Sequence, residues 1–476
     1  MPGFAGNRST GGQLALQERS LRRAINADPG NADASYNLGV ILQQLQRHEE
    51  AIENFRASLR IRAGADALLN IGVSLHALGR YAEALGSYAQ ALELDPGAAE
   101  AHNNAGNALQ ALGRHEESLA YYDRAIAANP GYLLAHDNRG NALKAIARYR
   151  DAIASYRRAL EIDPQNADAH HLTGLTQLCL GEYAQGWQGL EWRWKTPGAA
   201  GPPRKLSQPL WHGSEDLRGK SILLQAEQGL GDTIQFARYA PLVAERGATV
   251  LLDLYAPLVP LMQGIPGVSR VLAPQDSVPP IDFQCPLLSL PLAFGTTLDS
   301  IPPAIPYLTL ALEEASGRRA KLGGGGAKLV GLCWRGKPGY VNDAQRSIRF
   351  AELAPLWSVP DVRFVSLQKE LTDDEHAQAL ALTHFVHPGA DFRSTAEMIA
   401  ALDLVITVDT AWLHWAGSIG KPAWALLDFA PHWAWLTERE DSPWYPSVRL
   451  LRQAAPGEWR RPIGTAARML ASLVAR

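Results

Sequence analysis

Apolar residues between positions 14 and 195 recur at helical spacing, in paired segments separated by short polar turns. The pairs repeat every 33 or 34 residues, and four of them carry an asparagine two positions before a glycine. These asparagines are Asn37, Asn70, Asn104 and Asn138. Pro96, Pro130 and Pro164 close successive units, and because proline cannot continue a helix, each marks the exit from one pair into the next. The pattern predicts stacked helix pairs that bury their apolar faces only against their neighbours.

The pattern changes after Leu217, where short apolar runs alternate with helical segments. Strands are predicted at residues 221–226, 248–253, 268–272, 328–334, 362–367, 403–408 and 422–427. Helices are predicted at residues 233–246, 350–357, 395–402, 411–419 and 463–475, with another from Asp373. Strands that alternate with helices form parallel sheets, whose ligands lie beyond the carboxyl ends of the strands. Because the alternation occurs twice, we expect two doubly wound domains facing a cleft, with the last helix able to return across the first domain.

These patterns divide the chain into segments. A glycine-rich polar start is expected to be disordered, and two segments rich in glycine or proline are predicted to be linkers. The segments are a tail (1–13), a helical solenoid (14–195), a linker (196–216), a first α/β half (217–321), a glycine linker (322–327), a second α/β half (328–455) and a C-terminal helix (456–476). The predicted fold class is therefore an α-solenoid followed by two Rossmann-like domains.

The composition narrows the function classes. A net charge of −3 gives no sign of the clustered basic surface that nucleic acid requires. No apolar run approaches the length of a bilayer, and the start lacks a signal-peptide core, so neither a membrane span nor secretion is expected. The three cysteines lie far apart, which favours a reduced, cytoplasmic setting. Because HExxH, paired CxxC, P-loop and DxD motifs are absent from the sequence, we expect no bound metal and no cofactor.

The loop EQGLGDT follows the first predicted strand of the α/β region. Gly229 and Gly231 would let the backbone turn sharply and approach a ligand closely, and Asp232 stands at the start of the next helix. Two interpretations of Asp232 remain open. It either caps the helix, where aspartate is favoured, or presents its carboxylate to the cleft as a general base.

Cations and amides follow two neighbouring strands of the second half. Arg335, Lys337, Arg346 and Arg349 lie in the polar loop after residue 334, and Gln368 and Lys369 come directly after residue 367. Arginine offers a planar fork to phosphate oxygens and lysine a point charge. Any one of these residues alone would more often belong to a solvated loop, but their grouping at strand ends favours an anion site.

A third candidate is the segment TVDTAWLHWAGSIGKP, residues 407–422. Asp409 and Thr410 end a strand and open a helix whose free N–H groups favour anions or sugar hydroxyls, and His414 lies one turn further on. Alternatively, Asp409 only caps this helix. Further along, Trp444 lies between two prolines, where it would either stack on a nucleotide ring or pack against an interdomain hinge.

The helix pairs resemble the tetratricopeptide repeat over about residues 31–190. The segments QGLGDTIQFARYAPLVAERGATVLL and DLVITVDTAWLHWAGSIGKPAWALL resemble the two signature regions of the heptosyltransferase-like glycosyltransferases of family 9. From about residue 14 the chain resembles bacterial tetratricopeptide–glycosyltransferase fusions, some of which are linked to glycosylation of flagellin or other proteins. The resemblance implies a GT-B fold and a metal-independent, inverting transfer from a nucleotide-sugar, with Asp232 as the base.

The second signature of that family, D-[ST]-G-x-x-H, is matched by Asp409, Thr410 and His414. Ala411 replaces its glycine, which puts the usual close approach of backbone to phosphate in doubt. The resemblance gives the phosphate-contacting lysine of the family no certain counterpart, and Lys337 or Arg346 is the nearest candidate.

The repeated asparagines resemble the ladder in the eukaryotic protein O-GlcNAc transferase, as in AHNNAGNAL at residues 101–109. Asparagine can both donate to and accept from a peptide unit, and helices ~8–10 Å apart would meet about every third residue of an extended chain. Equally, these asparagines would bond to one another or to neighbouring helices. We expect a glycosyltransferase whose repeats recruit a polypeptide acceptor. Two other functions remain open: transfer to a lipid-linked or polysaccharide acceptor, and a non-catalytic scaffold with a degenerate transferase domain.

Overall fold

The computed structural model describes residues 4–197, 204–308, 312–323, 326–336, 343–389 and 391–475. The chain divides into two compact units between Ala169 and His170. Parts of both predicted linkers, at 198–203 and 324–325, lie outside the described residues.

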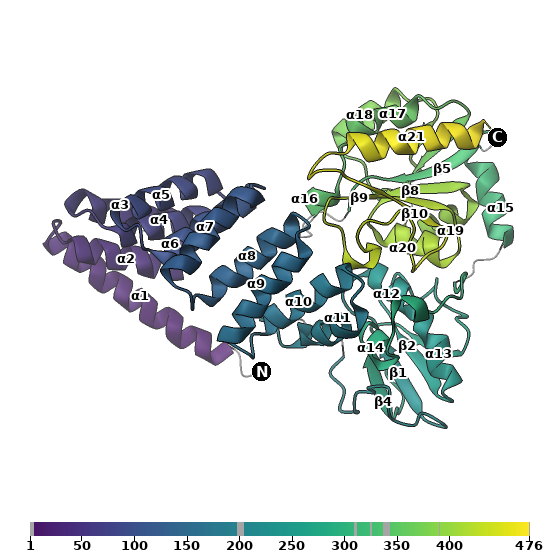
Figure 1. The fold of residues 1–476 in the computed structure, drawn as a ribbon, viewed down its shortest axis with the longest axis horizontal. Helices are drawn as coiled ribbons and strands as arrows, with labels where there is room; N and C mark the ends of the chain where they lie inside the picture. Colours follow the sequence, from purple (N-terminus) through teal and green to yellow (C-terminus); the bar gives the residue numbers. More distant parts are fainter. Residues whose placement is uncertain are drawn as a thin grey trace. The chain divides into compact units, whose positions relative to one another are not determined.

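The first unit is a stack of antiparallel helices (Figure 1). Its helices are α1 (Phe4–Ala27), α2 (Ala32–Gln44), α3 (His48–Ile61), α4 (Ala65–Ala77), α5 (Tyr81–Leu94), α6 (Ala99–Ala111), α7 (His115–Ala128), α8 (Leu133–Ala145), α9 (Tyr149–Ile162) and the start of α10 (Ala167–Cys179). The predicted helix pairs are α2 with α3, α4 with α5, α6 with α7, and α8 with α9. The helical solenoid is therefore confirmed. The tail prediction is wrong from Phe4 onward, because α1 extends to that residue, each added residue gaining a helical hydrogen bond.

The glycine of each repeat makes room for an aromatic ring from the second helix of the same pair. A Cβ atom on Gly39 would collide with the Phe55 ring, and one on Gly72 would collide with the Tyr88 ring. The same holds for Gly106 with Tyr122 and for Gly140 with Tyr156. These four rings are buried, so the 34-residue period records a close helix–helix contact that only glycine permits.

The first helices of the pairs line the inner side of the stack. α2 contacts α4, α4 contacts α6, and α6 contacts α8, whereas the second helices of successive pairs have weaker mutual contacts. In a curved stack the elements on the inside lie closer together than those on the outside. The side of α2, α4, α6 and α8 that carries the repeated asparagines therefore belongs to the concave region.

The last helix pair belongs to the second unit. From His170 onward α10 groups with α11 (Tyr183–Leu190) and the 3₁₀ helix Glu191–Trp194. The Trp187 indole N–H donates to the Thr296 carbonyl at 2.8 Å, and Arg193 forms a buried ion pair with Glu227. The aromatic-rich end of the solenoid is thus a structural part of the α/β region, which moves the domain boundary from residue 195 to residue 169.

The second unit contains a four-stranded parallel sheet in the order β3-β2-β1-β4. Its strands are β1 (Ser221–Gln225), β2 (Thr249–Asp253), β3 (Val268–Leu272) and β4 (Phe283–Pro286). The helices around it are α12 (Leu230–Phe236), α13 (Ala240–Glu245), α14 (Leu290–Ala293) and α15 (Leu312–Lys321), with 3₁₀ turns at Ala237–Tyr239, Leu287–Ser289 and Leu298–Ser300. β4 was not predicted, because its short run ends in proline, which an edge strand tolerates.

A second parallel sheet has the strand order β10-β9-β8-β5-β6-β7. Its strands are β5 (Lys328–Cys333), β6 (Val362–Ser366), β7 (Phe385–Val386), β8 (Leu404–Val408), β9 (Ala423–Leu427) and β10 (Val448–Arg452). The helices are α16 (Asp343–Arg346), α17 (Ala354–Trp357), α18 (Asp373–Leu380), α19 (Phe392–Ala401), α20 (Ala411–Ser418) and α21 (Arg460–Val474), with 3₁₀ turns at Phe350–Leu353 and Trp433–Trp435. The predicted α/β class with two parallel sheets is confirmed.

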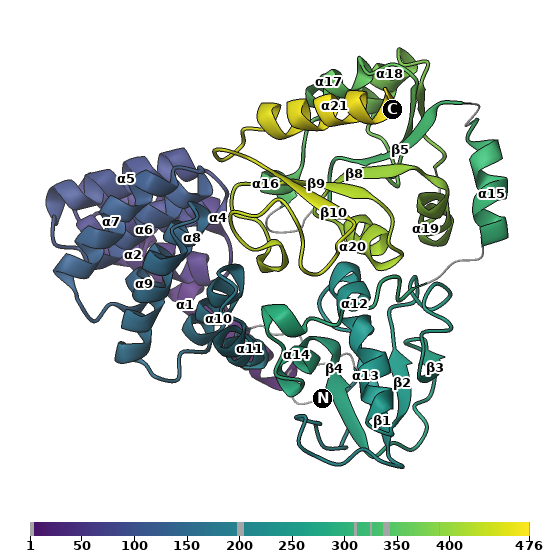
Figure 2. The ribbon, with the colours of Figure 1, turned by 45° about the vertical axis from the view of Figure 1, so that its right-hand side comes forward.

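The C-terminal helix stays on the second sheet. α21 contacts α17, β9 and β10, and its Ile463 and Leu470 side chains belong to the same apolar core as Val330 and Phe364 (Figure 2). The expectation that this helix returns across the first sheet is wrong, because its strongly one-sided apolar face is covered by the second sheet.

Both sheets reverse their strand order at one point. In the first sheet the reversal lies between β1 and β4, and in the second it lies between β5 and β8. Ligands of doubly wound sheets bind beyond the carboxyl ends of the strands at such reversals. The loops after β1, β5 and β8 are therefore where a site is expected. No helix within the described residues has the length and apolar character needed to span a bilayer.

Candidate functional site

The loop after β1 approaches the second half of the unit through Gly231. A Cβ atom on Gly231 would lie 2.7 Å from Cδ2 of His414, and α12 packs against α20 (Figure 1). The sharp turn is made by Gln228, whose φ is 63°, while Gly229 is extended. The prediction that the glycines form the turn is therefore wrong. Gly231 instead permits the close approach of α12 to α20, and the group that it contacts is the His414 side chain and not a ligand.

Asp232 is the third residue of α12. Its Oδ2 accepts a hydrogen bond from the Gly229 backbone N–H at 3.2 Å, so Asp232 does cap its own helix. Its Oδ1 has no hydrogen-bond partner among the described residues, and no arginine or lysine in that part of the chain pairs with the carboxylate. The side chain is half-buried. Asp232 thus combines a structural bond on one oxygen with a second oxygen that can accept a proton.

The loop after β8 places Asp409 and His414 together. His414 Nε2 lies 3.7 Å from Asp409 Oδ1, and His414 Nδ1 lies 3.1 Å from the Tyr445 hydroxyl. Burial acts to raise the pKa of Asp409, but interactions with His414, His432 and the Trp435 side chain together outweigh it, so the pKa is below its ordinary value. Thr410 precedes the first residue of α20, and its hydroxyl lies 3.2 Å from that of Thr407. The resulting site has an anchored carboxylate beside the N-terminus of an eight-residue helix.

Arg346 links the loops at the reversal of the second sheet. Its Nη1 donates to the Asp409 carbonyl at 2.8 Å, and its side chain covers Gly336, which leaves no room for a Cβ atom there. Arg346 also pairs with Asp343, its Nε lying 3.3 Å from Oδ1, and it is the candidate cation that the structure brings to the Asp409 loop. Lys337 lies outside the described residues.

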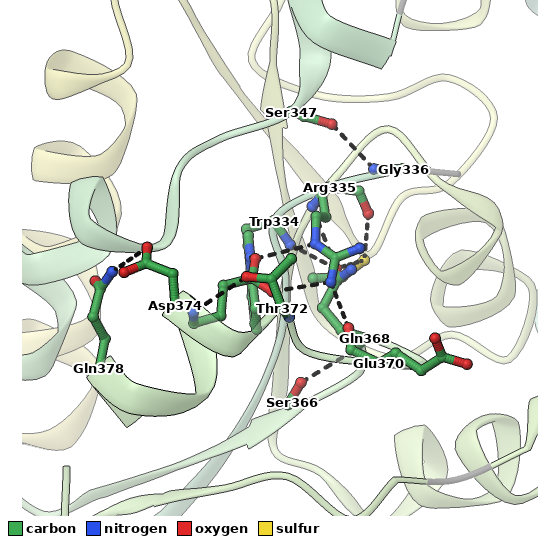
Figure 3. Close-up of polar contacts among 12 residues, drawn as sticks. Trp334, Arg335, Gly336, Ser347, Ser366, Gln368, Glu370, Thr372, Asp374 and Gln378 are labelled. Atoms are coloured by element: carbon green, nitrogen blue, oxygen red, sulfur yellow. Dashed lines mark hydrogen bonds and ion pairs between the residues drawn. The ribbon is translucent and has the colours of Figure 1, made fainter. Parts of the chain in front are cut away.

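Arg335 is committed to a structural ion pair. Its Nε and Nη2 donate to Oε1 and Oε2 of Glu375 at 3.1 and 2.9 Å, and Nη2 also donates to the Glu370 carbonyl (Figure 3). The prediction of Arg335 as a phosphate ligand is wrong, because its guanidinium holds the start of α18.

Gln368 and Lys369 have different environments. The Gln368 side-chain oxygen accepts from Cys333 Sγ at 3.0 Å and from the backbone N–H groups of Trp334 and Arg335 at 3.2 and 3.3 Å (Figure 3). This oxygen fixes the end of β5, and the amide nitrogen has no partner among the described residues. Lys369 is 85% exposed, with Nζ 3.7 Å from Glu370, and Arg349 pairs on the surface with Glu352. The surface interpretation therefore holds for Lys369 and Arg349.

Trp444 does not present a face to a ligand. It is fully buried, and its indole N–H donates to the Tyr183 hydroxyl at 2.9 Å. Its ring packs against Trp187 and Phe236, which tie the end of the solenoid to α12. The stacking prediction for Trp444 is wrong, because the proline-bounded loop is covered by the last helix pair of the solenoid.

Asp428, which directly follows β9, was not predicted. Burial and the negative charge of Asp409 raise the pKa of Asp428 to about 6, against the lowering effect of Arg346 and Arg452. Because β8 and β9 are neighbours in the sheet, the acids that follow them share one edge. The sequence does show a carboxylate after the apolar run AWALL, which is the signal that would have found it.

Arg238 was also missed, since nothing in the sequence near it suggests a partner. It is buried, and its guanidinium lies 4.8 Å from the centres of the Tyr307 and Tyr445 rings and 5.3 Å from that of Trp444. Its Nη1 donates to the Trp444 carbonyl at 2.8 Å. A cation held over the Tyr445 ring fixes the position of that ring, whose hydroxyl shares a hydrogen bond with His414 Nδ1, so Arg238 helps to orient the imidazole.

The repeated asparagines form part of a network inside the first unit. Asn70 donates to the Tyr36 hydroxyl at 3.0 Å, and Asn138 donates to Asn103, whose amide in turn donates to Asn104 at 3.3 Å. Asn37 is exposed, with no hydrogen-bond partner among the described residues. Bonding within the unit therefore uses three of the eight side-chain oxygen and nitrogen atoms of these four asparagines. The Asn70 and Asn138 side-chain oxygens and the Asn104 amide nitrogen still have no partner in the described chain.

Comparison with known proteins identifies the repeats. Tetratricopeptide-repeat models match residues 31–97, 69–132 and 148–181, so the chain contains these repeats. Protein FlbA of Caulobacter vibrioides is 31% identical over 326 residues, which cover 63% of this chain and 54% of FlbA. This chain therefore spans about half the length of that curated relative.

Three solved structures are similar to part of this chain. MamA has 21% identity and a TM-score of 0.32, covering 35% of this chain and 98% of MamA. PilF of Pseudomonas aeruginosa has 22% identity and a TM-score of 0.36, with 40% and 88% covered. YrrB, titled a TPR protein with an unusual peptide-binding site, has 21% identity and a TM-score of 0.32, with 37% and 91% covered.

Proposed function

We propose that this protein is a glycosyltransferase of the GT-B kind that moves a sugar from a nucleotide-sugar to a hydroxyl of a protein acceptor, with flagellin among the candidates. The observation that carries the proposal is the contact between Gly231 and His414. It joins α12, the helix that follows β1 at the reversal of the first sheet, to α20, the helix that follows β8 at the reversal of the second. A base on one loop and an anion-binding helix end on the other are the two parts that such a transfer requires.

In the proposed reaction Asp232 removes the proton of the acceptor hydroxyl through its Oδ1 oxygen. The acceptor oxygen forms a bond to the anomeric carbon while the bond from that carbon to the leaving phosphate oxygen breaks. The leaving nucleotide carries the electron pair and the added negative charge. In the proposal Arg346, which bonds to the Asp409 carbonyl, and the N-terminus of α20 stabilise that charge, and the transfer inverts the anomeric configuration.

The tetratricopeptide repeats supply the protein-interaction part of this function. In the proposal the acceptor polypeptide lies along the inner helices of the first unit, where the unused amide groups of Asn70, Asn104 and Asn138 can bond to its backbone.

A non-catalytic scaffold is the second candidate. It is favoured by the cap that Asp232 forms on its own helix, since that bond would account for the residue without any reaction.

Asp232→Asn separates the two functions. Asparagine retains an oxygen that can accept from the Gly229 N–H, so the cap survives, while the base is lost. With purified full-length protein and a panel of nucleotide-sugars, we expect transfer or donor hydrolysis to fall about 10²–10⁴-fold in Asp232→Asn. Glu245→Gln, an exposed acid in the same half, is the matched control and should retain activity. Unchanged turnover in Asp232→Asn would show that the assigned base is wrong, and absence of turnover in the wild type with every donor would favour the scaffold.

A further inference from the structure

Acidic residues recur along the inner helices with the same period as the asparagines. The second residue of the first helix is Asp33 in one repeat, Asp66 in the next and Glu100 in the third, and Asp168 holds that place in the last. All four are exposed. Asp33 pairs with Arg62, whereas the other three have no ion-pair partner among the described residues.

In the fourth repeat the acid of the first helix, α8, lies at a different position. Leu134 occupies the second position there and is 53% exposed, and Asp137 lies one helical turn further along the same face. Asp137 is 7% exposed, and its Oδ2 accepts from Asn166 at 2.8 Å, while its Oδ1 has no partner within the described chain. Burial raises the pKa of Asp137, and the charge of Asp168 raises it further.

The acids lie beside the asparagine network. Burial raises the pKa of the Tyr36 hydroxyl, and the charges of Asp66 and Glu100 add to this effect. The same hydroxyl accepts a hydrogen bond from Asn70. The Tyr36 hydroxyl is therefore within electrostatic range of two acids and bonded to Asn70, whose amide also donates to the backbone carbonyl of Asp66 at 2.9 Å.

Cations are scarce on this side of the stack. Helices α2, α4 and α6 contain no lysine or arginine, and α8 contains Arg139 and Lys144. Arg139 is directed to Asp123 and Ser155 on the second helices. Within the described residues, Asp66, Glu100 and Asp168 on the inner helices are thus not paired with a lysine or arginine, although the whole chain has a net charge of only −3.

We propose that the inner groove of the repeats selects an extended acceptor segment that carries lysine or arginine side chains. The asparagines bind its backbone, and the row of acids formed by Asp66, Glu100, Asp137 and Asp168 attracts its positive charges. The inference rests on the proposed recruitment of a polypeptide and specifies its chemistry. Repeats stand ~8–10 Å apart and an extended chain rises ~3.3 Å per residue, so a basic residue at about every third position matches the row. Asp66, Glu100 and Asp168 are open to direct contact. Asp137 acts through its charge, because its side chain is enclosed.

The test is binding of labelled peptides of about twelve residues to the full-length protein in the absence of any donor. One peptide carries lysine at every third position in a serine and alanine background, and a second carries glutamine at those positions. We expect the lysine peptide to bind about tenfold or more tightly than the glutamine peptide, with the difference shrinking at high salt.

The triple variant Asp66→Asn, Glu100→Gln, Asp168→Asn should remove most of this preference. The control triple Glu53→Gln, Glu93→Gln, Glu116→Gln changes the net charge equally on exposed positions of the second helices and should stay within about twofold of the wild type. Circular dichroism and thermal unfolding confirm that both triples are folded.

Equal binding of the two peptides, no binding of either, or an equal loss in both triples overturns the proposal. These outcomes are independent of catalysis, because the experiment contains no nucleotide-sugar. Failure of the Asp232 experiment with success here would leave a peptide-binding scaffold, and the reverse result would leave a transferase whose groove does not read charge.

Discussion

The contact between Gly231 and His414 gives a quantitative prediction about the junction of the two sheets. In Gly231→Ala the new Cβ would lie 2.7 Å from His414 Cδ2, 3.3 Å from Nε2 and 3.5 Å from Cγ. Carbon atoms in contact prefer about 3.5–4.0 Å, so the ring or the helix must move by about 1 Å. The imidazole is held by Tyr445 and cannot turn away freely.

We expect Gly231→Ala to lower the free energy of unfolding of the second unit by about 1–3 kcal/mol, the usual cost of overpacking. His414→Ala removes the ring, so adding Gly231→Ala to it should cost nothing and should gain part of the helix preference of alanine over glycine. The double-mutant cycle should therefore give a coupling of at least about 1 kcal/mol.

Tryptophan fluorescence during urea unfolding is a suitable assay, because all 13 tryptophans lie at or after residue 187 and the signal reports only the second unit. Gly86→Ala serves as the control, since a Cβ there meets nothing within 4 Å and the site is in the first unit. Effects of Gly231→Ala and His414→Ala that add within about 0.5 kcal/mol would refute the contact.

Two further predictions test the repeats and the acid pair. Gly72→Ala should destabilise the solenoid by about 1–3 kcal/mol through collision with the Tyr88 ring, whereas Gly86→Ala in the next helix should stabilise it by up to about 1 kcal/mol. Circular dichroism of the helices during unfolding measures both changes. If both variants change the free energy of unfolding in the same direction, the glycine–ring packing is contradicted. Asp428 has a pKa of about 6 in the folded protein, against an ordinary value of 3.8. Between about pH 4 and pH 6 the folded protein therefore keeps a proton on Asp428 that the unfolded chain releases, so the free energy of unfolding falls as the pH rises through this range. Asp428→Asn should therefore gain up to about 3 kcal/mol over the wild type above pH about 6 and nothing below pH about 4. A gain that is constant with pH would show that the pKa of Asp428 is not raised in the folded protein.

Much of the fold followed from local patterns. The Asn-x-Gly period predicted the helix pairs, and the apolar runs predicted β1, β2, β3, β5, β6, β8 and β9 within one or two residues. These features are local, because the apolar pattern of a helix face or of a buried parallel strand lies within one short segment of the sequence. β4, β7 and β10 were missed: β4 and β7 are short, and all three are edge strands that owe their pairing to neighbours distant in sequence.

The site was predicted only in part. Asp232, Asp409, Thr410 and His414 were placed after strand ends by sequence, and the helices that follow those strands, α12 and α20, do pack together. The predicted roles of Arg335 and Trp444 were wrong, because Arg335 pairs with Glu375, 40 residues further along the chain, and Trp444 bonds to Tyr183, about 260 residues earlier.

The sequence by itself determined which helices repeat, which strands are parallel and which loops follow them, because each depends on spacing within a few turns of chain. Only the tertiary structure decided that the last repeat is built into the α/β unit, that Gly231 serves a contact with His414, and that Asp428 shares an edge with Asp409. The physical reason is that burial, charge pairing and close packing depend on distances in space, and residues far apart in sequence set those distances.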